Sequence, residues 1–254
     1  MPIRVERDPS ISWVIIDRED KGNSLDYEHA RELARAIAEE CQATETSVVA
    51  LTGSGTRFFS TGVDLASVAE VRDEKDAWKL MYEGLGGICG ALHECSKPVI
   101  AAVNGHAIGI GFELLHAVDI AVAVKGAKFG TPAVKWGMVP PGTPTVGPIL
   151  LGYKTAAYLV LTGDLISADE ARDRGIVNIV VEDHEELRKT VREIAEKIAG
   201  NDQWAVRMAK ELLREARSRA NIQRGLMALV YSTARKETRE RTKEFFKKKE
   251  KKHG

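Results

Sequence analysis

Two glycine-bearing segments of this 254-residue chain follow apolar runs and have the residue types of an oxyanion-binding site. They are RFFSTGVDL (57–65), which contains Gly62, and NGHAIGIGFELL (104–115), which contains Gly109 and Gly111. A turn from a strand into a helix leaves backbone N–H groups without internal acceptors, and the helix dipole adds positive potential there. We therefore expect these turns to stabilise a negatively charged oxygen of a ligand or an intermediate.

Neither segment has a nucleotide-binding signature. GHAIGIG lacks the GxGxxG spacing, no acidic residue follows a second strand to hold a ribose, and the chain has no GxxxxGK[ST] phosphate loop. On the residues alone, the glycines either shape an oxyanion site or serve tight turns and close packing.

The second segment contains an acidic side chain and is followed directly by a histidine. Glu113 comes two residues after Gly111, so that a general base there would lie within about one helical turn of the oxyanion site. Alternatively, its carboxylate only favours the helix dipole, which is worth about 0.3–1 kcal/mol. His116 lies three residues further on the same helix face and either shares a polar pocket with Glu113 or packs at a subunit interface.

Strands and helices must position these turns. Residues 12–19 (SWVIIDRE) predict a strand, 27–42 an amphipathic helix, and 47–55 (SVVALTGSG) a buried parallel strand, which together form a βαβ unit. Residues 97–105 repeat the strand pattern, and 112–124 predict a helix that runs toward another apolar run.

The remaining third of the chain has a helical composition. Residues 154–163 predict a helix ended by Gly163, and apolar stripes on charged backgrounds continue from about residue 185. We therefore predict an α/β core over residues 1–185 and a helical region over residues 186–254.

Composition bounds the class of protein. Hydrophobic residues make up 44% and charged residues 29%, which is typical of a globular protein and excludes disorder and a collagen-like chain. No apolar run approaches a membrane span, and charged residues interrupt the first twenty positions, so we expect a cytoplasmic protein without a signal peptide. Cys41, Cys89 and Cys95 are odd in number and lack CxxC spacing, which favours buried thiols over disulfides or a metal site.

The neutral total charge hides an asymmetry. Residues 235–254 carry ten Lys/Arg against four Asp/Glu, which leaves residues 1–234 with a net charge of −6. Such a tail attracts phosphates in a salt-sensitive, nonspecific way. It has no aromatic interleaving beyond Phe245 and Phe246, so a nucleic-acid partner is not expected.

Four segments in order match one family. They are LTGSGTRFFSTGVDL (51–65), KPVIAAVNGHAIGIGFELLHAVDI (97–120), AKFGTPAVKWGMVP (127–140) and LTGDLISADEARDRGIVNIVV (161–181). The chain thereby resembles the crotonase superfamily, that is, the enoyl-CoA hydratase/isomerase family. This resemblance implies an α/β fold with a crotonase-like ββα spiral core and a C-terminal helical region that forms oligomer contacts and closes the pocket. It also implies an acyl-CoA thioester substrate, a homotrimer or homohexamer, and no cofactor beyond the CoA of the substrate.

The resemblance also implies roles for individual residues. The backbone amides of Val63 and Ile110 would hold the thioester carbonyl as it becomes an enolate, and Glu113 matches the first of two family catalytic glutamates. His116 is a further catalytic candidate, and basic residues near 247–249 would meet the CoA phosphates. The predicted substrate- and CoA-binding residues are Lys21, Asn23, Ser24, Leu25, Arg57, Gly62, Val63, Asp64, Leu65, Gly109 and Ile110.

The chain departs from the family pattern at the second glutamate. Where hydratases have a motif like FGxPExxLGxxP, this sequence reads FGTPAVKWGMVP, so Ala133 occupies the position of the acid. The following stretch is also altered, because PPGTPTVGP (140–148) stands where the family commonly has PGAGGT. Thr143 and Tyr231 are candidate replacement donors, whereas His106 and Asp119 are interpreted as structural.

The predicted function is an enoyl-CoA hydratase/isomerase-like enzyme that stabilises a thioester enolate with one retained glutamate. The missing acid also fits an isomerase, a decarboxylase or a thioester hydrolase of the same superfamily. A catalytically impaired CoA- or RNA-binding relative is the remaining alternative. The sequence does not specify the acyl group.

Overall fold

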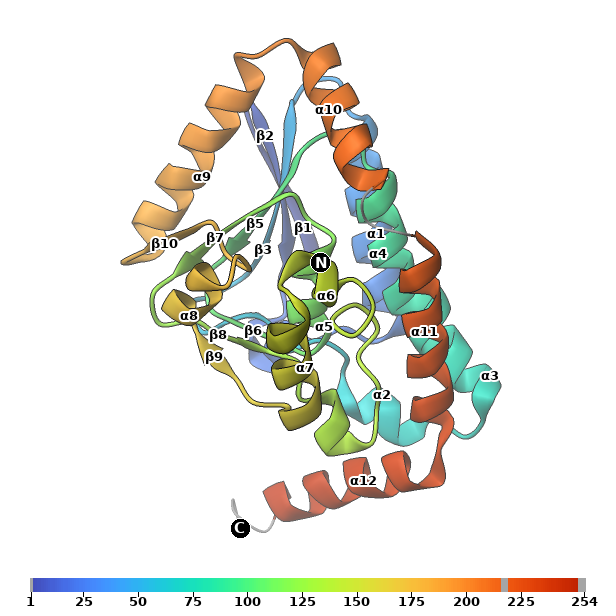
Figure 1. Cartoon of the computed structure of the whole chain (residues 1–254). Coiled ribbons are helices and arrows are strands. Elements are labelled where there is room, and N and C mark those ends of the chain that lie inside the picture. Colours follow the sequence, from blue (N-terminus) through green and yellow to red (C-terminus); the bar gives the residue numbers. More distant parts are fainter. Residues whose placement is uncertain (1, 216–218, 251–254) are drawn as a thin grey trace.

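Two sheets form the centre of the molecule (Figure 1). A computed structural model describes residues 2–215 and 219–250. The larger sheet has the order β1-β2-β3-β5-β7-β10 and the smaller one the order β4-β6-β8-β9. Their strands are β1 (Ile3–Asp8), β2 (Ile11–Ile16), β3 (Val48–Gly53), β4 (Phe58–Ser60), β5 (Val99–Val103), β6 (His106–Ile108), β7 (Ile120–Val124), β8 (Lys128–Gly130), β9 (Ile166–Ser167) and β10 (Ile179–Val181).

From β3 to β8, successive strands belong to the larger and the smaller sheet in turn. Strands β3, β5 and β7 lie side by side and parallel in the larger sheet, while β4, β6 and β8 lie parallel in the smaller one. Antiparallel pairing is confined to β1 with β2 and β8 with β9. Each of the strand pairs β3–β4, β5–β6 and β7–β8 thus adds one strand to each sheet, which confirms the predicted ββα spiral.

Helices surround the sheets. Figure 1 shows α9 on one side of the larger sheet and α1 with α4 on the other. After β10, all elements in the described ranges are helices, as predicted. The helices are α1 (Tyr27–Gln42), α2 (Leu65–Glu70), α3 (Glu74–Ala77), α4 (Gly86–Glu94), α5 (Ile110–Glu113), α6 (Gly147–Leu150), α7 (Tyr153–Thr162), α8 (Ala168–Asp173), α9 (His184–Ala199), α10 (Gln203–Glu215), α11 (Arg219–Ala234) and α12 (Lys236–Glu250). Short 3₁₀ helices cover Glu19–Lys21, Leu114–His116 and Pro132–Trp136, and Trp78–Leu85 is a π-helix.

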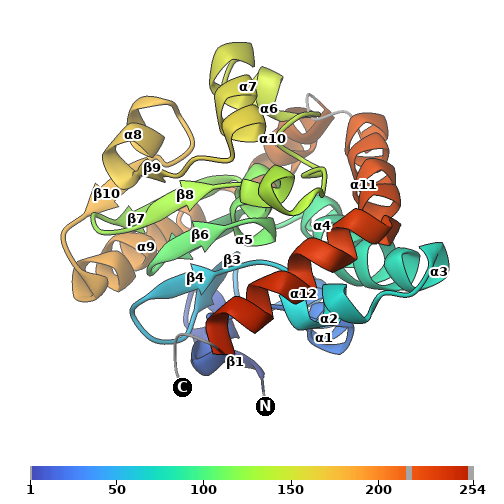
Figure 2. The same ribbon diagram turned by 90° about the horizontal axis from the view of Figure 1, so that it is seen from below.

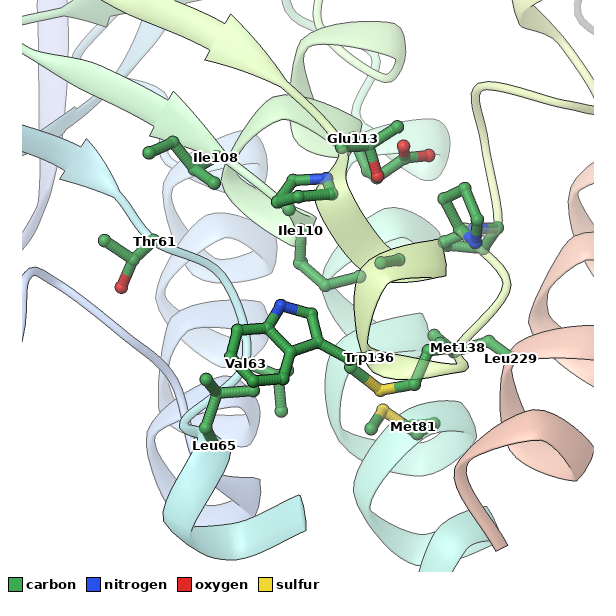
Figure 3. Close-up of a pocket in the computed structure, with 16 residues that line it drawn as sticks. Thr61, Val63, Leu65, Met81, Ile108, Ile110, Glu113, Trp136, Met138 and Leu229 are labelled. Carbon is green, nitrogen blue, oxygen red and sulfur yellow. The ribbon is translucent and has the colours of Figure 1, made fainter. Parts of the chain in front are cut away.

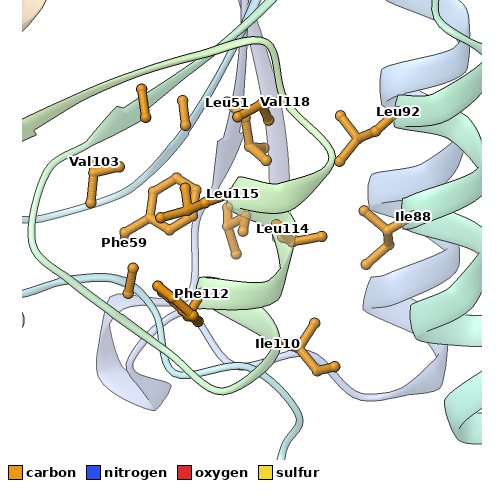
Figure 4. Packing of buried hydrophobic residues seen from close by; sticks show 14 of the residues in the cluster. Leu51, Phe59, Ile88, Leu92, Val103, Ile110, Phe112, Leu114, Leu115 and Val118 are labelled. Atoms are coloured by element: carbon orange, nitrogen blue, oxygen red, sulfur yellow. The ribbon is translucent and has the colours of Figure 1, made fainter. Parts of the chain in front are cut away.

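The core fills the space between the two sheets and α4 (Figure 4). Leu51 and Val103 reach it from the larger sheet, Phe59 from the smaller sheet, and Phe112 from α5; all four are buried. All six residues of β2 are buried as well, because both of its faces are covered. The α5 segment is therefore anchored by apolar packing directly next to the predicted turns.

The predicted helix over 112–124 is shorter than expected. Helix α5 and the following 3₁₀ turn end at His116, and the β-branched run Ile120–Val124 pairs with β5 as strand β7. Asp119 lies between the 3₁₀ turn and β7, and its Oδ2 accepts the N–H of Val99 at the start of β5 at 2.8 Å. Lys210 of α10 also contacts this carboxylate at 2.8 Å, which joins the helical region to the core. The structural interpretation of Asp119 is confirmed.

Helix α12 lies across α2 and the 132–136 segment (Figure 2). Thr238 of α12 is buried and its hydroxyl donates to the backbone carbonyl of Ser232 at 2.8 Å. Phe245 makes an edge contact with the ring of Trp136, with centroids 5.0 Å apart. The predicted phosphate contacts include Lys249, whose side chain lies outside the described residues, as do positions 251–254. Within the described ranges no helix is long and apolar enough to cross a membrane.

The cysteine prediction is wrong for two of the three residues. Cys41 near the end of α1 and Cys95 just after α4 form a disulfide, with Cα atoms 5.3 Å apart. Their sequence separation of 54 hides the pair in the sequence, and the packing of α1 against α4 brings them together. Cys89 is the free thiol of the described residues, and burial, followed by the nearby Glu113 carboxylate, raises its pKa to about 12.

We predict that Cys41→Ser will lower the free energy of unfolding by about 2–4 kcal/mol, because the disulfide closes a long loop in the unfolded chain. Denaturant unfolding with and without reductant measures this change. Cys89→Ser is the matched control and should keep the wild-type response to reductant. Equal stability of oxidised wild type and Cys41→Ser would contradict a stabilising disulfide.

Candidate active site

A mostly apolar cavity of about 220 Å³ lies where the two glycine turns meet the 131–141 segment (Figure 3). Met81 of the π-helix and Leu229 of α11 also line this cavity. Among the described lining residues Glu113 alone is ionisable, so the cavity offers a carboxylate in an apolar setting. The lining residues are Thr61, Val63, Leu65, Met81, Ile108, Gly109, Ile110, Glu113, Thr131, Pro132, Ala133, Trp136, Met138, Pro140, Pro141 and Leu229.

The two glycine turns meet at one wall of this cavity. Gly62 and Gly109 have φ values of 87° and 58°, which L side chains rarely adopt. A Cβ at Gly62 would lie 2.5 Å from the backbone nitrogen of Ile110. The amide that follows Gly62, that of Val63, therefore lies close to the amide of Ile110. Neither N–H has a hydrogen-bond acceptor in the part of the chain that the structure describes.

Further backbone contacts lock the turns together. A Cβ at Gly111 would lie 2.3 Å from the carbonyl oxygen of Ser60, so only glycine fits there. The Ser60 hydroxyl accepts the Gly62 N–H at 3.0 Å and donates to the carbonyl of Asn23 at 2.8 Å. Leu25 also brackets Val63, because its N–H donates to the Gly62 carbonyl and its carbonyl accepts the Asp64 N–H, both at 2.8 Å. Glycine at these positions therefore serves both close packing and amide presentation.

Glu113 is 3% exposed, and the loop that follows Pro141 holds its carboxylate. Its Oε2 accepts the N–H groups of Gly142 and Thr143 at 2.5 and 2.7 Å, and its Oε1 accepts the Thr143 hydroxyl at 2.5 Å. The same hydroxyl lies 3.0 Å from Nε2 of buried His116. Glu113 and His116 thus share one polar cluster through Thr143.

The position of the missing acid also lines the cavity. Ala133 belongs to the 3₁₀ turn Pro132–Trp136, and Trp136 of the same turn lines the cavity near Val63 (Figure 3). A methyl group there cannot donate a proton. Tyr231, the other candidate donor, is 58% exposed and does not line the cavity. His106 accepts the Lys128 N–H at 3.1 Å, and burial, with Arg57 and Lys128, lowers its pKa, which agrees with a structural role.

Some of the other predicted ligand-binding residues are used within the protein, whereas others are exposed or line the cavity. Asn23 is buried and its side chain is used within the protein, donating to the carbonyls of Ser54 and Phe58 at 3.0 and 2.7 Å. The Asp64 carboxylate accepts the Ala66 N–H at the start of α2. Lys21 and Arg57 are exposed, and the Arg57 guanidinium lies over the Phe58 ring. Ser24 is buried beside Asn23, and Leu65 lines the cavity.

Sequence reasoning missed the backbone contribution of the loop. Thr143 was predicted as a donor toward the ligand, whereas its hydroxyl and amide both point to Glu113. The amide of Gly142 was not predicted at all. The sequence marked 140–148 only as altered relative to the family, and its contact with Glu113 depends on tertiary structure. In the described residues no group of His, Cys, Asp or Glu could hold a metal ion.

A family model described as enoyl-CoA hydratase/isomerase matches residues 6–253. Among curated relatives, a carnitinyl-CoA dehydratase of Salmonella typhi is 36% identical over 215 residues, which cover 84% of this chain and 80% of that protein.

Solved structures agree. OdaA of Pseudomonas aeruginosa superposes with a TM-score of 0.88 at 29% identity, covering 96% of this chain and 98% of the other. An enoyl-CoA hydratase/isomerase of Mycobacterium paratuberculosis gives a TM-score of 0.86 at 28% identity, with the same coverage.

We predict that Gly62→Ala will destabilise the protein by about 1–3 kcal/mol, because the new Cβ meets the Ile110 nitrogen and φ is positive. Gly90→Ala in α4 is the matched control. Its Cβ meets nothing within 4 Å, and alanine in a helix interior should stabilise by about 0.5–1 kcal/mol. Denaturant unfolding measures both. Equal effects of the two substitutions would contradict the close approach of the turns.

Proposed function

Since the chain belongs to the enoyl-CoA hydratase/isomerase family, we propose that it binds acyl-CoA thioesters and transfers a proton at the carbon next to the thioester carbonyl. One observation carries this proposal. The amides of Val63 and Ile110 lie close together on the wall of the cavity that also contains the buried carboxylate of Glu113. An acid/base group beside two unused N–H donors is the arrangement that enolate chemistry requires.

The two amides would hold the thioester oxygen. When a base removes a proton from the carbon next to the carbonyl, negative charge moves onto that oxygen. Backbone N–H groups are rigid and cannot titrate, so they need little reorganisation as the charge develops. Loss of one such donor costs about 10²–10³ in rate in other enzymes. The positive φ angles of Gly62 and Gly109 support this role for the amides that follow them.

Glu113 would act as the base and then return the proton. Its burial keeps solvent away, and three hydrogen bonds to its oxygens fix its orientation. Ala133 leaves no second carboxyl group in the described lining, so one glutamate serves both proton transfers. We propose hydration of an enoyl-CoA to a 3-hydroxyacyl-CoA, or the reverse dehydration, as the reaction, in line with the dehydratase name of one relative.

A second candidate is enolate chemistry without addition of water, as in double-bond migration or decarboxylation. Ala133 favours it, because neither reaction needs a second acid to orient water. The apolar lining residues Met81, Trp136 and Leu229 support an apolar acyl group for either reaction.

The remaining proposals concern recognition and assembly. Exposed Lys21, Arg57 and the basic side chains of α12 such as Lys247 are the proposed contacts for CoA, and we propose no separate cofactor. We propose a homotrimer or homohexamer, which the exposed apolar stripe of Trp204, Met208 and Leu212 on α10 supports. This spacing puts the three side chains on one helix face.

We predict that Glu113→Gln will lower kcat by about 10²–10⁴ while KM stays close to wild type, because the amide cannot accept the substrate proton. Glu185→Gln on the exposed face of α9 is the matched control and should retain full activity. Mass spectrometry of short 2-enoyl- and 3-enoyl-CoA mixtures separates water addition, double-bond migration, loss of CO₂ and thioester hydrolysis. An unchanged rate for Glu113→Gln would remove its assignment, and binding without any turnover would favour a binding protein.

We predict that Ala133→Glu will raise the hydration rate of crotonyl-CoA by up to about 10²-fold, because it supplies a second acid at the cavity wall. Ala133→Gln has nearly the same size without a titrating proton and serves as control. A comparable gain in both variants would mean that size, not acidity, limits the wild type. No gain in either would mean that Glu113 alone suffices.

A further inference from the structure

We propose that Thr143 and His116 are positioning residues for Glu113: the Thr143 hydroxyl holds the carboxylate, and His116 fixes the direction of that hydroxyl. The inference rests on the proposed function, because both residues act only through Glu113. It assigns a role to the altered 140–148 segment, whose Pro140 and Pro141 line the same cavity as Ala133.

The direction of the hydrogen bonds follows from the number of protons available. Thr143 Oγ1 has one proton, and Glu113 Oε1 at 2.5 Å is a carboxylate oxygen that can only accept. The hydroxyl must therefore accept at its other contact, Nε2 of His116 at 3.0 Å. This assigns the proton of the imidazole to Nε2 on that side. The chain of donors runs from His116 through Thr143 to Glu113.

These contacts leave the carboxylate little freedom. A carboxylate has about four acceptor positions. Both positions of Oε2 are filled by the amides of Gly142 and Thr143, and one position of Oε1 is filled by the Thr143 hydroxyl. One position of Oε1 remains for a substrate proton or a water among the contacts of the described residues. The hydroxyl thus selects which lone pair of Glu113 is used.

The loop itself is held from two sides. A Cβ at Gly225 of α11 would lie 1.8 Å from the Pro141 carbonyl oxygen, so α11 presses directly on the loop backbone. The Thr145 hydroxyl donates to the same carbonyl at 2.7 Å. From the other side, a Cβ at Gly142 would lie 2.7 Å from Glu113 Oε2 and 3.2 Å from the His116 ring.

The missing second acid explains why such positioning matters. With Ala133 in its place, the same carboxylate must take a proton from the substrate and return it along one path. Small displacements of a catalytic group cost up to about 10² in rate. His116 is itself fixed by an edge contact with Phe112, whose ring centroid lies 5.1 Å away. The cluster is therefore rigid from the core to the carboxylate.

The first test removes the hydroxyl alone. Thr143→Val keeps the backbone amide and the shape of the side chain, so we expect kcat to fall about 10- to 100-fold with KM within about threefold. Thr143→Ser restores the hydroxyl and should recover most of the activity. Thr233→Val is the matched control, because this buried hydroxyl has no hydrogen-bond partner in the described residues and lies outside the cavity.

The second test is a double-mutant cycle with His116→Phe, which keeps a ring against Phe112. If His116 acts through Thr143, the double variant should be no slower than Thr143→Val alone. Full additivity of the two effects would overturn the chain. Unchanged kcat in Thr143→Val, or no recovery in Thr143→Ser, would overturn the role of the hydroxyl.

Nitrogen NMR of the wild type provides a readout independent of turnover. In the wild type we expect a proton on Nε2 of His116, bonded to the Thr143 hydroxyl. In Thr143→Val the Nε2 signal should shift, because this hydrogen bond is lost. A His116 ring without a proton on Nε2 would overturn the proposed direction. Absence of any Glu113-dependent turnover in wild type would instead remove the proposed function, and the positioning role with it.

Discussion

The close approach of two glycine turns is the constraint on which the cavity depends. Backbone of β4 and α5 can meet only because Gly62 and Gly111 lack a Cβ, which would otherwise collide with Ile110 N and Ser60 O. This contact places two amides beside each other just after β4 and β6 of the smaller sheet. Apolar packing of Phe59 and Phe112 behind the turns resists their separation. The same residues thus stabilise the core and shape the site.

The C-terminal helices complete the cavity rather than only covering the core. Leu229 of α11 lines it, and Gly225 allows the same helix to contact the Pro141 carbonyl. Helix α12 adds the contact of Phe245 with Trp136, which also lines the cavity. The described part of the basic tail therefore packs against a residue that lines the pocket.

A buried polar network joins the helical region to the larger sheet. Lys210 of α10 contacts the Asp119 carboxylate and donates to the Lys97 carbonyl, while Lys97 itself is 1% exposed and donates to the Glu40 carbonyl. Burial lowers the pKa of Lys97. Removing one member of such a network leaves an uncompensated polar group, which costs more than the pair contributes. The residues that make these contacts are far apart in the sequence.

The sequence by itself determined the family, the first βαβ unit, the helical C-terminal region and the place of Glu113 next to a glycine turn, because local patterns and motif spacing carry this information. Only the tertiary structure decided the pairing of Cys41 with Cys95, the end of α5 at a short 3₁₀ turn, and the contact of Thr143 with Glu113. Each of these depends on segments that are distant in sequence and meet through packing. Local propensity cannot specify such contacts, since their free energy comes from surfaces that only the folded chain brings together.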